Sequence, residues 1–321
     1  MSRVARIAWA ALWLNVLVIL WGAFVRATGS GAGCGEHWPL CNGEVLPRSP
    51  RTDTVVEFVH RVTSGMALLA VGWLTYAAFR VKPRVASLRR AAAASMALIV
   101  SEAAVGAGLV LFRLVADNDS MARALFMGVH LVNTFLLLGA LTLAAHAASG
   151  GAALGIRARP LLSTLFLVVL SALTVAGASG AVAALGDTLY PSRSLGEALA
   201  QDLSSTSHIL IRLRILHPAL AIASGVANIA VCRLAARTTP DATTTRLVMI
   251  VEGLVAAQVA AGFANVLLLA PVWMQIVHLL LADLLWISLV LTAARTLRVA
   301  DRTAPATSYP GMSPVAGRVS P

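Results

Sequence analysis

Four histidines lie near the ends of long apolar segments, two in each half of the chain: His60, His130, His217 and His278. Neutral imidazole is a common metal ligand, and two imidazoles on facing helices can hold a haem iron from opposite sides. Zinc would instead want three or four converging ligands, usually with cysteine or carboxylate help. Histidines also gather at membrane interfaces because the polar ring can reach water. The two-per-half pattern favours two haem pockets.

The stretch "EFVHRVTSG" places a carboxylate and a guanidinium beside the first histidine. Glu57 precedes His60 by three residues, so both lie on one helix face, whereas the matching place before His217 holds Arg214. One acid between two similar pockets suggests a reactive site in the first half and a bound cofactor in the second. Glu57 could equally pair with Arg61 at a hydrated helix start, and both interpretations stay open. Three arginines at this depth are candidate contacts for haem propionates: Arg61, Arg212 and Arg214.

The sequence makes less specific predictions for the other cysteines, glycines, histidines and glutamates. Cys34 and Cys41 flank a glycine-rich loop, where an oxidising compartment permits a disulfide, redox-active or structural. Glycines near the histidines would let a flat macrocycle approach the backbone: Gly65, Gly128 and Gly225. Three histidines outside the pattern are expected to be solvated or interfacial: His37, His146 and His208. Glu102 and Glu252 lie within apolar segments and receive no role.

The elements that carry these residues are membrane helices. Of the 321 residues, 58% are hydrophobic and only 12% are charged, against about 25% charged in soluble domains. A span needs about 20 apolar residues. Such stretches are found near 7–25, 57–79, 91–112, 126–148, 160–180, 213–235, 246–268 and 273–295. The expected fold is therefore an all-α integral membrane protein with eight transmembrane helices.

The positive charges predict the orientation of these helices. With the N-terminus inside, sixteen Lys and Arg fall on the cytoplasmic side and nine on the outer side. Both termini are then cytoplasmic, and the four histidines lie towards the outer face. The net charge of +11 does not indicate nucleic-acid binding, because the charges are spread over short loops rather than gathered on one helix face.

The two halves of the chain resemble each other. Residues 128–146 align with the segment from Ile276 when His130 is placed on His278, and the histidine separations are 70 and 61 residues. A duplicated bundle is a common membrane architecture. We expect two pseudo-symmetric four-helix bundles, residues 1–150 and 151–300. The Pro/Ser/Gly-rich tail, residues 301–321, is expected to be disordered.

The motifs together resemble one family. "WGAFVRATGSGAGCGEHWPLCNG" followed by "EFVHRVTSG", with later "GVHLVNT", "ILHPALA" and "IVHLLLAD", is similar to haem A synthase over residues 7 to about 295. The resemblance implies eight helices in two bundles in the cell membrane. It implies oxidation of the ring methyl group of haem O to a formyl group, giving haem A for cytochrome c oxidase. Haem O synthase is the implied partner, beside membrane lipid and an unidentified electron acceptor. A homo-oligomer is left open.

The resemblance also assigns residues. His60 and His130 would bind the substrate haem, and the second pair, His217 and His278, would ligate a haem b cofactor. Glu57 would be the functionally needed acid, with Cys34 and Cys41 as the outer-loop disulfide. Some members carry a second cysteine pair between spans five and six, which this chain lacks.

Two other functions fit the same pattern. A di-haem cytochrome b acting only as a quinol-linked electron carrier shares the histidines and the fold, but needs no acid in one half alone. A transporter with an inverted repeat ranks last, because these repeats run parallel and four histidines on one side serve no obvious translocation. Extraction of the pigments from membranes separates the first two.

Overall fold

The computed structural model describes residues 2–48 and 50–298, and this part of the chain is helical with two isolated β-bridges. The predicted disordered tail, residues 301–321, lies outside the described residues. The helices are α1 (Arg3–Ala27), η1 (Ser30–Ala32), α2 (Thr52–Arg80), α3 (Ala86–Leu111), α4 (Met121–Ala148), η2 (Ile156–Ala158), α5 (Pro160–Leu189), α6 (Leu195–Leu203), α7 (Ile209–Arg214), α8 (Leu216–Thr238), α9 (Ala242–Leu267) and α10 (Val272–Thr296).

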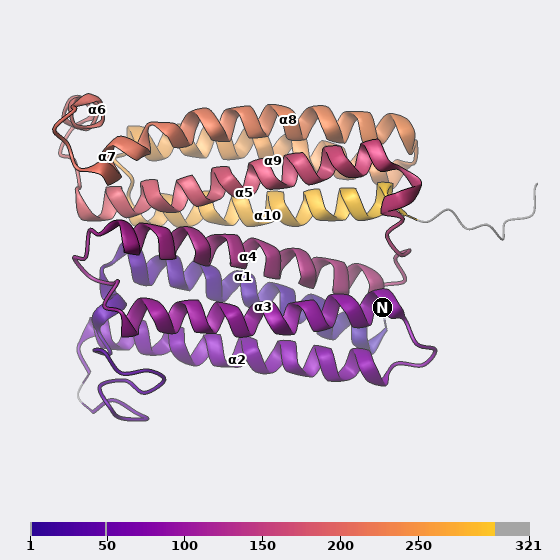
Figure 1. Ribbon diagram of the computed structural model, residues 1–321, viewed down its shortest axis with the longest axis horizontal. Helices are drawn as coiled ribbons and strands as arrows, with labels where there is room; N and C mark the ends of the chain where they lie inside the picture. Colours follow the sequence, from indigo (N-terminus) through magenta and orange to yellow (C-terminus); the bar gives the residue numbers. More distant parts are fainter. Residues whose placement is uncertain (1, 49, 299–321) are drawn as a thin grey trace, which may run out of the picture.

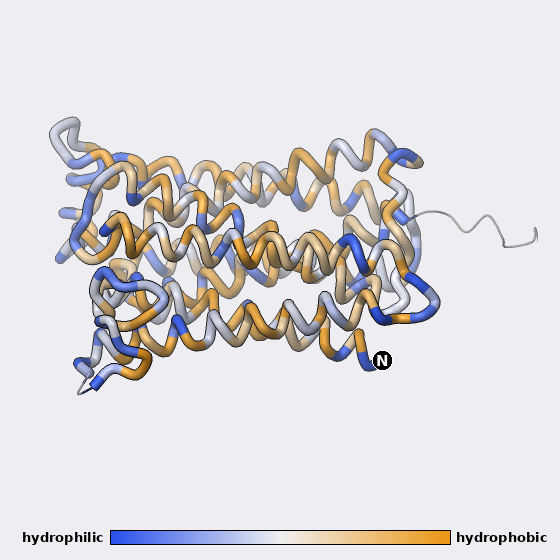
Figure 2. The backbone as a smooth tube through the Cα atoms, turned by 60° about the horizontal axis from the view of Figure 1, so that its bottom comes forward, coloured by the Kyte–Doolittle hydropathy of each residue, from blue (hydrophilic) through white to orange (hydrophobic). Residues whose placement is uncertain are grey.

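Within the described ranges, eight segments are long and apolar enough to cross a membrane, with α7 and α8 together making the sixth. This confirms the predicted number of spans and a multi-pass membrane protein. The helices run roughly parallel, and Figure 2 shows hydrophobic residues along their lengths and hydrophilic ones gathered at both ends of the bundle.

Helices α4 and α9 begin several residues before their apolar runs, and each has a polar side chain capping its first turn. Ser120 accepts a hydrogen bond from the Arg123 N–H at the start of α4, and Asp241 accepts from the N–H groups of Thr243 and Thr244 at the start of α9. Such side chains satisfy backbone donors that the first helical turn leaves free. Apolar periodicity alone therefore placed these starts several residues late.

The loop between spans five and six contains helix α6, which the sequence analysis missed. Ser194 caps α6 by accepting from the Glu197 N–H, and the Glu197 carboxylate accepts from the Arg193 N–H. The sequence "SLGE" has the Ser-x-x-Glu spacing of a capping box, and this signal could have predicted the helix.

The spanning helices form two groups of four. In Figure 1, α1 to α4 lie together in the lower part of the view, and α5, α8, α9 and α10 lie together in the upper part. Phe135 of α4 stacks on Trp286 of α10, with ring centroids 4.8 Å apart. One hydrophobic cluster includes residues from both groups. The predicted boundary near residue 150 and the pseudo-symmetry of two bundles stay predictions.

The two ends of the described chain lie at the same end of the bundle. The Ser2 hydroxyl donates to the Ala148 carbonyl at 3.2 Å, and the Gly155 N–H donates to the Leu297 carbonyl at 2.6 Å. The opposite end carries the loop between α1 and α2 and the loop between α5 and α8 (Figure 1). Which end faces the cytoplasm stays a prediction.

Candidate functional site

The second histidine pair is close enough to hold one metal between its rings. His217 of α8 and His278 of α10 have ring centroids 6.2 Å apart and ring planes at 88°. An imidazole–metal bond is about 2 Å long and the centroid lies about 1 Å behind the nitrogen, so two rings on opposite sides of one metal have centroids roughly 6 Å apart. The spacing therefore fits an iron between the two rings.

Helix α5 orients His217. The Nδ1 atom lies 3.1 Å from the Ala176 carbonyl and 3.1 Å from the Ser179 hydroxyl. A hydrogen bond from Nδ1–H to a carbonyl fixes the tautomer in which Nε2 carries the lone pair that a metal needs. A Cβ added at Gly180 would lie 2.8 Å from the His217 ring, so this place needs glycine. Gly180 was not singled out from the sequence.

A break between α7 and α8 places His217 at the start of a helix. Pro218 has no N–H and its ring clashes with the carbonyl of the preceding turn, so the helix ends at Arg214 and α8 begins at Leu216. In the first half, by contrast, His60 lies inside the uninterrupted helix α2.

Helix α9 contacts the other ring of the second pair. His278 Nε2 lies 3.2 Å from the amide nitrogen of Gln258, and His278 Nδ1 has no hydrogen-bond partner among the described residues. A Cβ at Gly262 would lie 3.3 Å from the ring. Gly225, which the sequence suggested as a place of approach for the macrocycle, instead lets α8 pack closely, since a Cβ there would lie 2.9 Å from the Val255 side chain.

The first pair consists of His60 on α2 and His130 on α4. A Cβ at Gly22 of α1 would lie 2.9 Å from the His60 ring, which parallels Gly180 beneath His217. The Nδ1 atoms of both histidines are buried and have no hydrogen-bond partner in the described part of the chain. Buried polar atoms are normally paired, so two unpaired imidazole nitrogens are unusual within an apolar bundle.

Near the first pair, a Cβ added at Gly65 or Gly128 would have no other atom within 4 Å. Glu102 of α3 approaches His130, with Oε1 3.3 Å from Nδ1. The sequence analysis left Glu102 without a role, and its place on α3 gave no sign that it would meet a histidine of α4. The open space at Gly65 and Gly128 is compatible with a planar group beside these helices.

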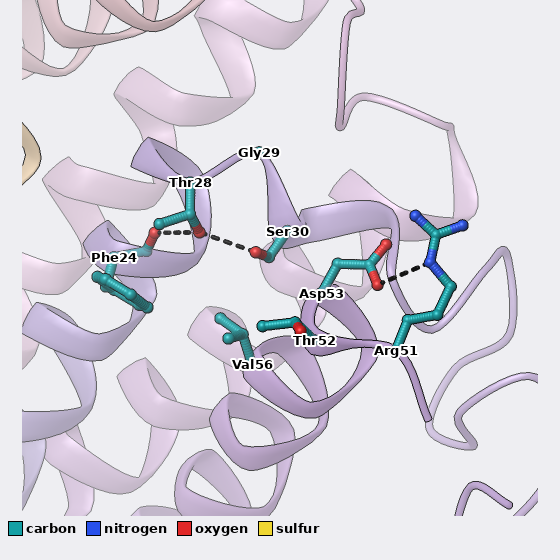
Figure 3. A pocket seen from close by; sticks show the side chains of 8 residues that line it. All are labelled: Phe24, Thr28, Gly29, Ser30, Arg51, Thr52, Asp53 and Val56. Carbon is teal, nitrogen blue, oxygen red and sulfur yellow. Dashed lines mark hydrogen bonds and ion pairs between the residues drawn. The ribbon is translucent and has the colours of Figure 1, made fainter. Parts of the chain in front are cut away.

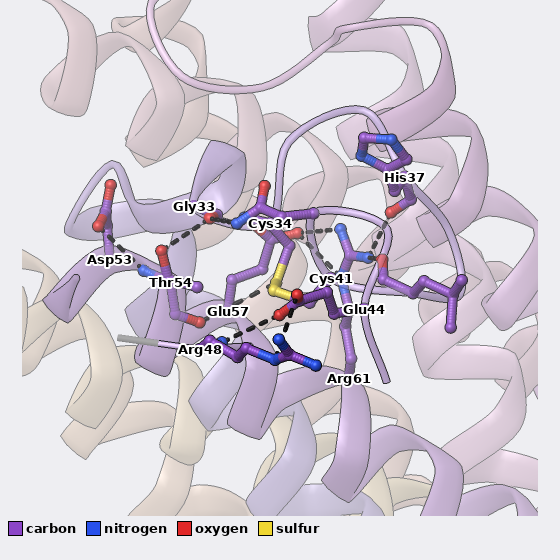
Figure 4. Close-up of a disulfide and its surroundings, with 12 residues drawn as sticks. Gly33, Cys34, His37, Cys41, Glu44, Arg48, Asp53, Thr54, Glu57 and Arg61 are labelled. Atoms are coloured by element: carbon purple, nitrogen blue, oxygen red, sulfur yellow. Dashed lines mark hydrogen bonds and ion pairs between the residues drawn. A yellow bond between two sulfur atoms is a disulfide. The ribbon is translucent and has the colours of Figure 1, made fainter. Parts of the chain in front are cut away.

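Glu57 is buried and bound by three donors (Figure 4). Its Oε2 accepts from the Cys34 N–H at 2.8 Å, and its Oε1 accepts from Nε of Arg61 at 3.0 Å and from Nη2 of the same guanidinium. Arg61 Nη1 also donates to the carbonyls of His37 and Leu40. The predicted Glu57–Arg61 pair is therefore present, but at 3% exposure for Glu57 it does not lie at a hydrated helix start. An ionised carboxylate has about four acceptor positions, so these bonds occupy most of them.

The predicted cysteine pair is a disulfide. Cys34 and Cys41 are bonded, and both are buried. The loop rests on the first turn of α2, where the Thr54 hydroxyl donates to the Gly33 carbonyl at 2.8 Å. A Cβ at Gly33 would lie 2.4 Å from the Asp53 backbone, so only glycine allows this approach. Because thiol–disulfide exchange needs access to a sulfur, burial favours a structural staple.

Two of the three candidate propionate arginines already have carboxylate partners. Arg61 binds Glu57, and Arg214 lies 2.8 Å from both Asp187 and Asp202. Arg212 is exposed. Their contact with propionates stays a prediction, and Arg212 is the one of the three without a carboxylate contact in the described structure.

Arg26 joins the two helix groups, a role that was not predicted from the sequence. Arg26, at the end of α1, donates to the Ala184 carbonyl at 2.7 Å, the Thr188 hydroxyl at 2.9 Å and the Gln275 side-chain oxygen at 2.7 Å. These partners lie on α5 and α10. From the sequence Arg26 counted only as an outer-side charge, and no local pattern shows such distant partners.

A cavity of about 700 Å³ opens between the ends of α1 and α2 (Figure 3). It is lined by Phe24, Thr28, Gly29, Ser30, Arg51, Thr52, Asp53 and Val56. Its polar rim includes a Thr28–Ser30 hydroxyl pair at 2.8 Å and an exposed Arg51–Asp53 ion pair at 3.4 Å. The lining contains none of the four histidines, so this cavity is distinct from both pairs.

Comparison with known proteins gives one family and two kinds of relative. Residues 5–290 match the family described as cytochrome oxidase assembly protein (COX15-CtaA). A protein named protoheme IX farnesyltransferase from Thermus thermophilus is 48% identical over 296 residues, which cover 92% of this chain and 49% of that protein. The chain thus spans about half the length of this relative.

Proteins named heme A synthase match over shorter stretches. One from Staphylococcus haemolyticus is 36% identical over 128 residues, 38% of this chain and 41% of that protein. One from Alkalihalophilus pseudofirmus is 38% identical over 97 residues, 30% of this chain and 33% of that protein.

Proposed function

The chain belongs to the cytochrome oxidase assembly protein family (COX15-CtaA), and from this premise we propose that it is a haem A synthase. In this proposal it is an oxidoreductase that converts the ring methyl group of haem O to a formyl group. The observation that carries the proposal is the family match over residues 5–290, which includes all four histidines, Glu57 and the disulfide. Relatives named heme A synthase support it.

The farnesyltransferase name of the Thermus relative is compatible with this proposal. That protein is about twice as long as the matched region, so its remaining half is free to carry the farnesyl transfer for which it is named. A protein that farnesylates haem in one half and resembles this chain in the other would make and consume a farnesylated haem in succession. This arrangement supports haem O synthase as the partner of the present chain.

We assign the first pair, His60 and His130, to the substrate haem O, and the second pair, His217 and His278, to a haem b cofactor. The second assignment is supported by the 6.2 Å between ring centroids and by the contacts of His217 Nδ1 with α5. When bound, haem b would supply a one-electron redox centre. The protein's own part is to hold the rings, and Gly22 and Gly180 leave room for them.

Glu57 is proposed as the acid of the first site. Conversion of a methyl group to a formyl group with water as oxygen source releases four protons and four electrons, so proton acceptors and an electron acceptor are required. Glu57 is held by its bonds to Cys34 and Arg61, one turn before His60. A carboxylate there can take a proton or stabilise positive character at the oxidised carbon. The oxygen source and the electron acceptor are not identified.

We further propose that the protein lies in the cell membrane with both termini in the cytoplasm and both haem sites towards the outer face. The excess of Lys and Arg on the inner side supports this orientation. The disulfide between Cys34 and Cys41 at the histidine end of α2 agrees with an oxidising outer compartment.

Pigment extraction tests the function. Membranes of a host that makes haem O but not haem A are expected to contain haem A when this chain is expressed, and not when the His60→Ala variant is expressed. If the membranes hold only unchanged haem b, the chain is a di-haem electron carrier, the second candidate, and the synthase proposal is wrong.

A further inference from the structure

A hydrogen-bonded network inside the first helix group ends at one of the proposed iron ligands. Glu102, on the apolar helix α3, accepts from the Asn133 amide through Oε2 at 2.5 Å and from the Thr134 hydroxyl through Oε1 at 2.5 Å. The same Oε1 lies 3.3 Å from Nδ1 of His130. Intramembrane carboxylates are costly and usually mark a functional place.

The network is anchored on both helices. The Asn133 amide also donates to the Leu98 carbonyl at 2.9 Å, and its oxygen accepts from the Ser101 hydroxyl at 2.7 Å. The Thr134 hydroxyl lies 2.9 Å from the His130 carbonyl, one turn earlier on α4. The Glu102 carboxylate is therefore held at a defined place beside the imidazole.

The second helix group has a different side chain at the matching place. Gln258 on α9 contacts His278 on α10 at Nε2, whereas Glu102 on α3 contacts His130 on α4 at Nδ1, and each is followed four residues later by a glycine. The residues three and four after His278 are leucine and alanine, where α4 has Asn133 and Thr134. The second group thus has an uncharged amide and no corresponding network.

We propose that Glu102 is a positioning residue of the first site, which orients His130 through Nδ1 and makes it a more strongly donating ligand than His278. The inference rests on the proposed function, in which His130 ligates haem. A carboxylate that accepts from the distal ring N–H fixes the tautomer with Nε2 as ligand and raises the donor strength of the imidazole. In this structure Oε1 of Glu102 and Nδ1 of His130 lie 3.3 Å apart without hydrogen-bond alignment.

The expected consequence is a difference in redox behaviour between the two sites. A more strongly donating imidazole stabilises oxidised iron over reduced iron. The haem of the first site therefore has a lower reduction potential than it would have with a glutamine in place of Glu102. A substrate site of low potential gives up electrons more readily to the second site. Glu102 would then favour electron flow from substrate to cofactor.

The experiment uses the purified full chain with protohaem IX, which lacks the farnesyl tail, bound in both sites. Glu102→Gln gives the first site the amide of the second, and Gln258→Glu makes the reverse change as the matched variant. Loss of an outer partner of a metal-bound histidine typically costs 10–100-fold in affinity. We expect Glu102→Gln to weaken the binding of oxidised haem about tenfold relative to the binding of reduced haem. This corresponds to a rise of about 59 mV in the reduction potential of the first-site haem. Gln258→Glu is expected to leave the first-site potential unchanged.

A purely structural role gives a different result. If Glu102 only links α3 to α4, Glu102→Gln lowers the thermal stability and leaves the first-site potential and spectrum unchanged, which would overturn the proposal. Should this variant not accumulate, Glu102→Asp is used, since it keeps the charge but withdraws it from Nδ1; the same potential is expected to rise by less, and an unchanged potential again overturns the proposal.

Different results would overturn the proposed function and the role of Glu102. Absence of haem A from membranes with the wild-type chain overturns the proposed function. Normal haem A formation together with an unchanged first-site potential in Glu102→Gln overturns the role of Glu102 alone.

Discussion

The two histidine pairs are held by chemically different surroundings. His60 and His130 have carboxylates nearby, Glu57 on the same helix and Glu102 across the helix interface. His217 is instead held by a backbone carbonyl and a serine hydroxyl, and His278 by an amide. A carboxylate can exchange protons near neutral pH and is a stronger acceptor for a ring N–H than a neutral carbonyl or amide. The difference shows that two similar histidine pairs on one scaffold can be given different chemical surroundings by a few side chains.

The loops above the two pairs differ as well. A disulfide loop is tied to α2 through Glu57 and Arg61 in the first group. In the second group, Arg214 is held between Asp187 and Asp202. In the first group, Glu57 and Arg61 join the disulfide loop to the helix turns on either side of His60. In the second group, the two aspartates neutralise Arg214, which lies three residues before His217. Only the first loop therefore connects to the proposed acid.

The largest expected effect comes from removing one ligand in each group. His130→Leu is expected to abolish haem A formation and remove the first-site haem while the second-site haem is retained. His278→Leu is expected to remove the second-site haem while the first-site haem is retained. Haem content and optical spectra of the purified variants measure this. Loss of both haems from either variant would show that the two sites are not independent.

Glu57→Gln is expected to lower the rate of haem A formation by about 10²–10⁴-fold, the usual contribution of a general acid or base, with both haems still bound. The amide keeps one acceptor oxygen for the Cys34 N–H, so the loop stays in place. Glu44→Gln is the matched control, because Glu44 lies in the same loop in an exposed pair with Arg48. Full haem A production by Glu57→Gln would remove Glu57 from the mechanism.

Gly180→Ala is expected to displace the His217 ring, because the new methyl group would lie 2.8 Å from it. Overpacking of this kind costs about 1–3 kcal/mol, and the second site should release its haem faster. Gly253→Ala on α9 is the control, since its added Cβ meets no described atom within 4 Å. Equal haem dissociation rates in both variants would contradict the close approach at Gly180.

Asp283→Leu tests a further difference between α4 and α10. Asp283 is fully buried with no hydrogen-bond partner in the described structure, five residues after His278, where Phe135 stands five residues after His130. Replacing an unsatisfied buried polar group by an apolar one of similar size is neutral or stabilising. The thermal midpoint of Asp283→Leu is expected to equal or exceed that of the wild type. A variant that is stable but inactive would give Asp283 a functional role.

The smallest effect concerns the start of α9. The Thr244 N–H and hydroxyl and the Arg295 guanidinium hold the pKa of Asp241 well below its usual range. Because the folded-state pKa is the lower one, the stabilisation is complete above the unfolded value of about 3.9 and is lost as the pH falls below it. Helix α3 has no such side-chain cap at Val85.

Asp241→Asn is therefore expected to flatten the acid limb of the thermal midpoint plotted against pH. The asparagine keeps a capping oxygen and removes the charge. An unchanged acid limb in this variant would show that Asp241 does not contribute to the pH dependence.

Several features could be predicted from the sequence because they depend on local composition or spacing. Eight apolar runs predicted eight spans, since a hydrocarbon core requires about 20 apolar residues from each. Two cysteines seven residues apart permitted a disulfide, and the family resemblance implied it. The Glu57–Arg61 pair followed from its i, i+4 spacing on one helix. Helix α6 was missed although its capping box lies in the sequence.

Only the tertiary structure decided which distant residues meet. Glu102 and His130 are 28 residues apart, Gly180 and His217 are 37 apart, and Arg26 meets Gln275 across 249 residues. No local pattern specifies such contacts, because the packing and rotation of whole helices set them. The sequence by itself determined which residues are able to bind a metal, and the packing of the helices determined which of them face each other and what stands behind each ring.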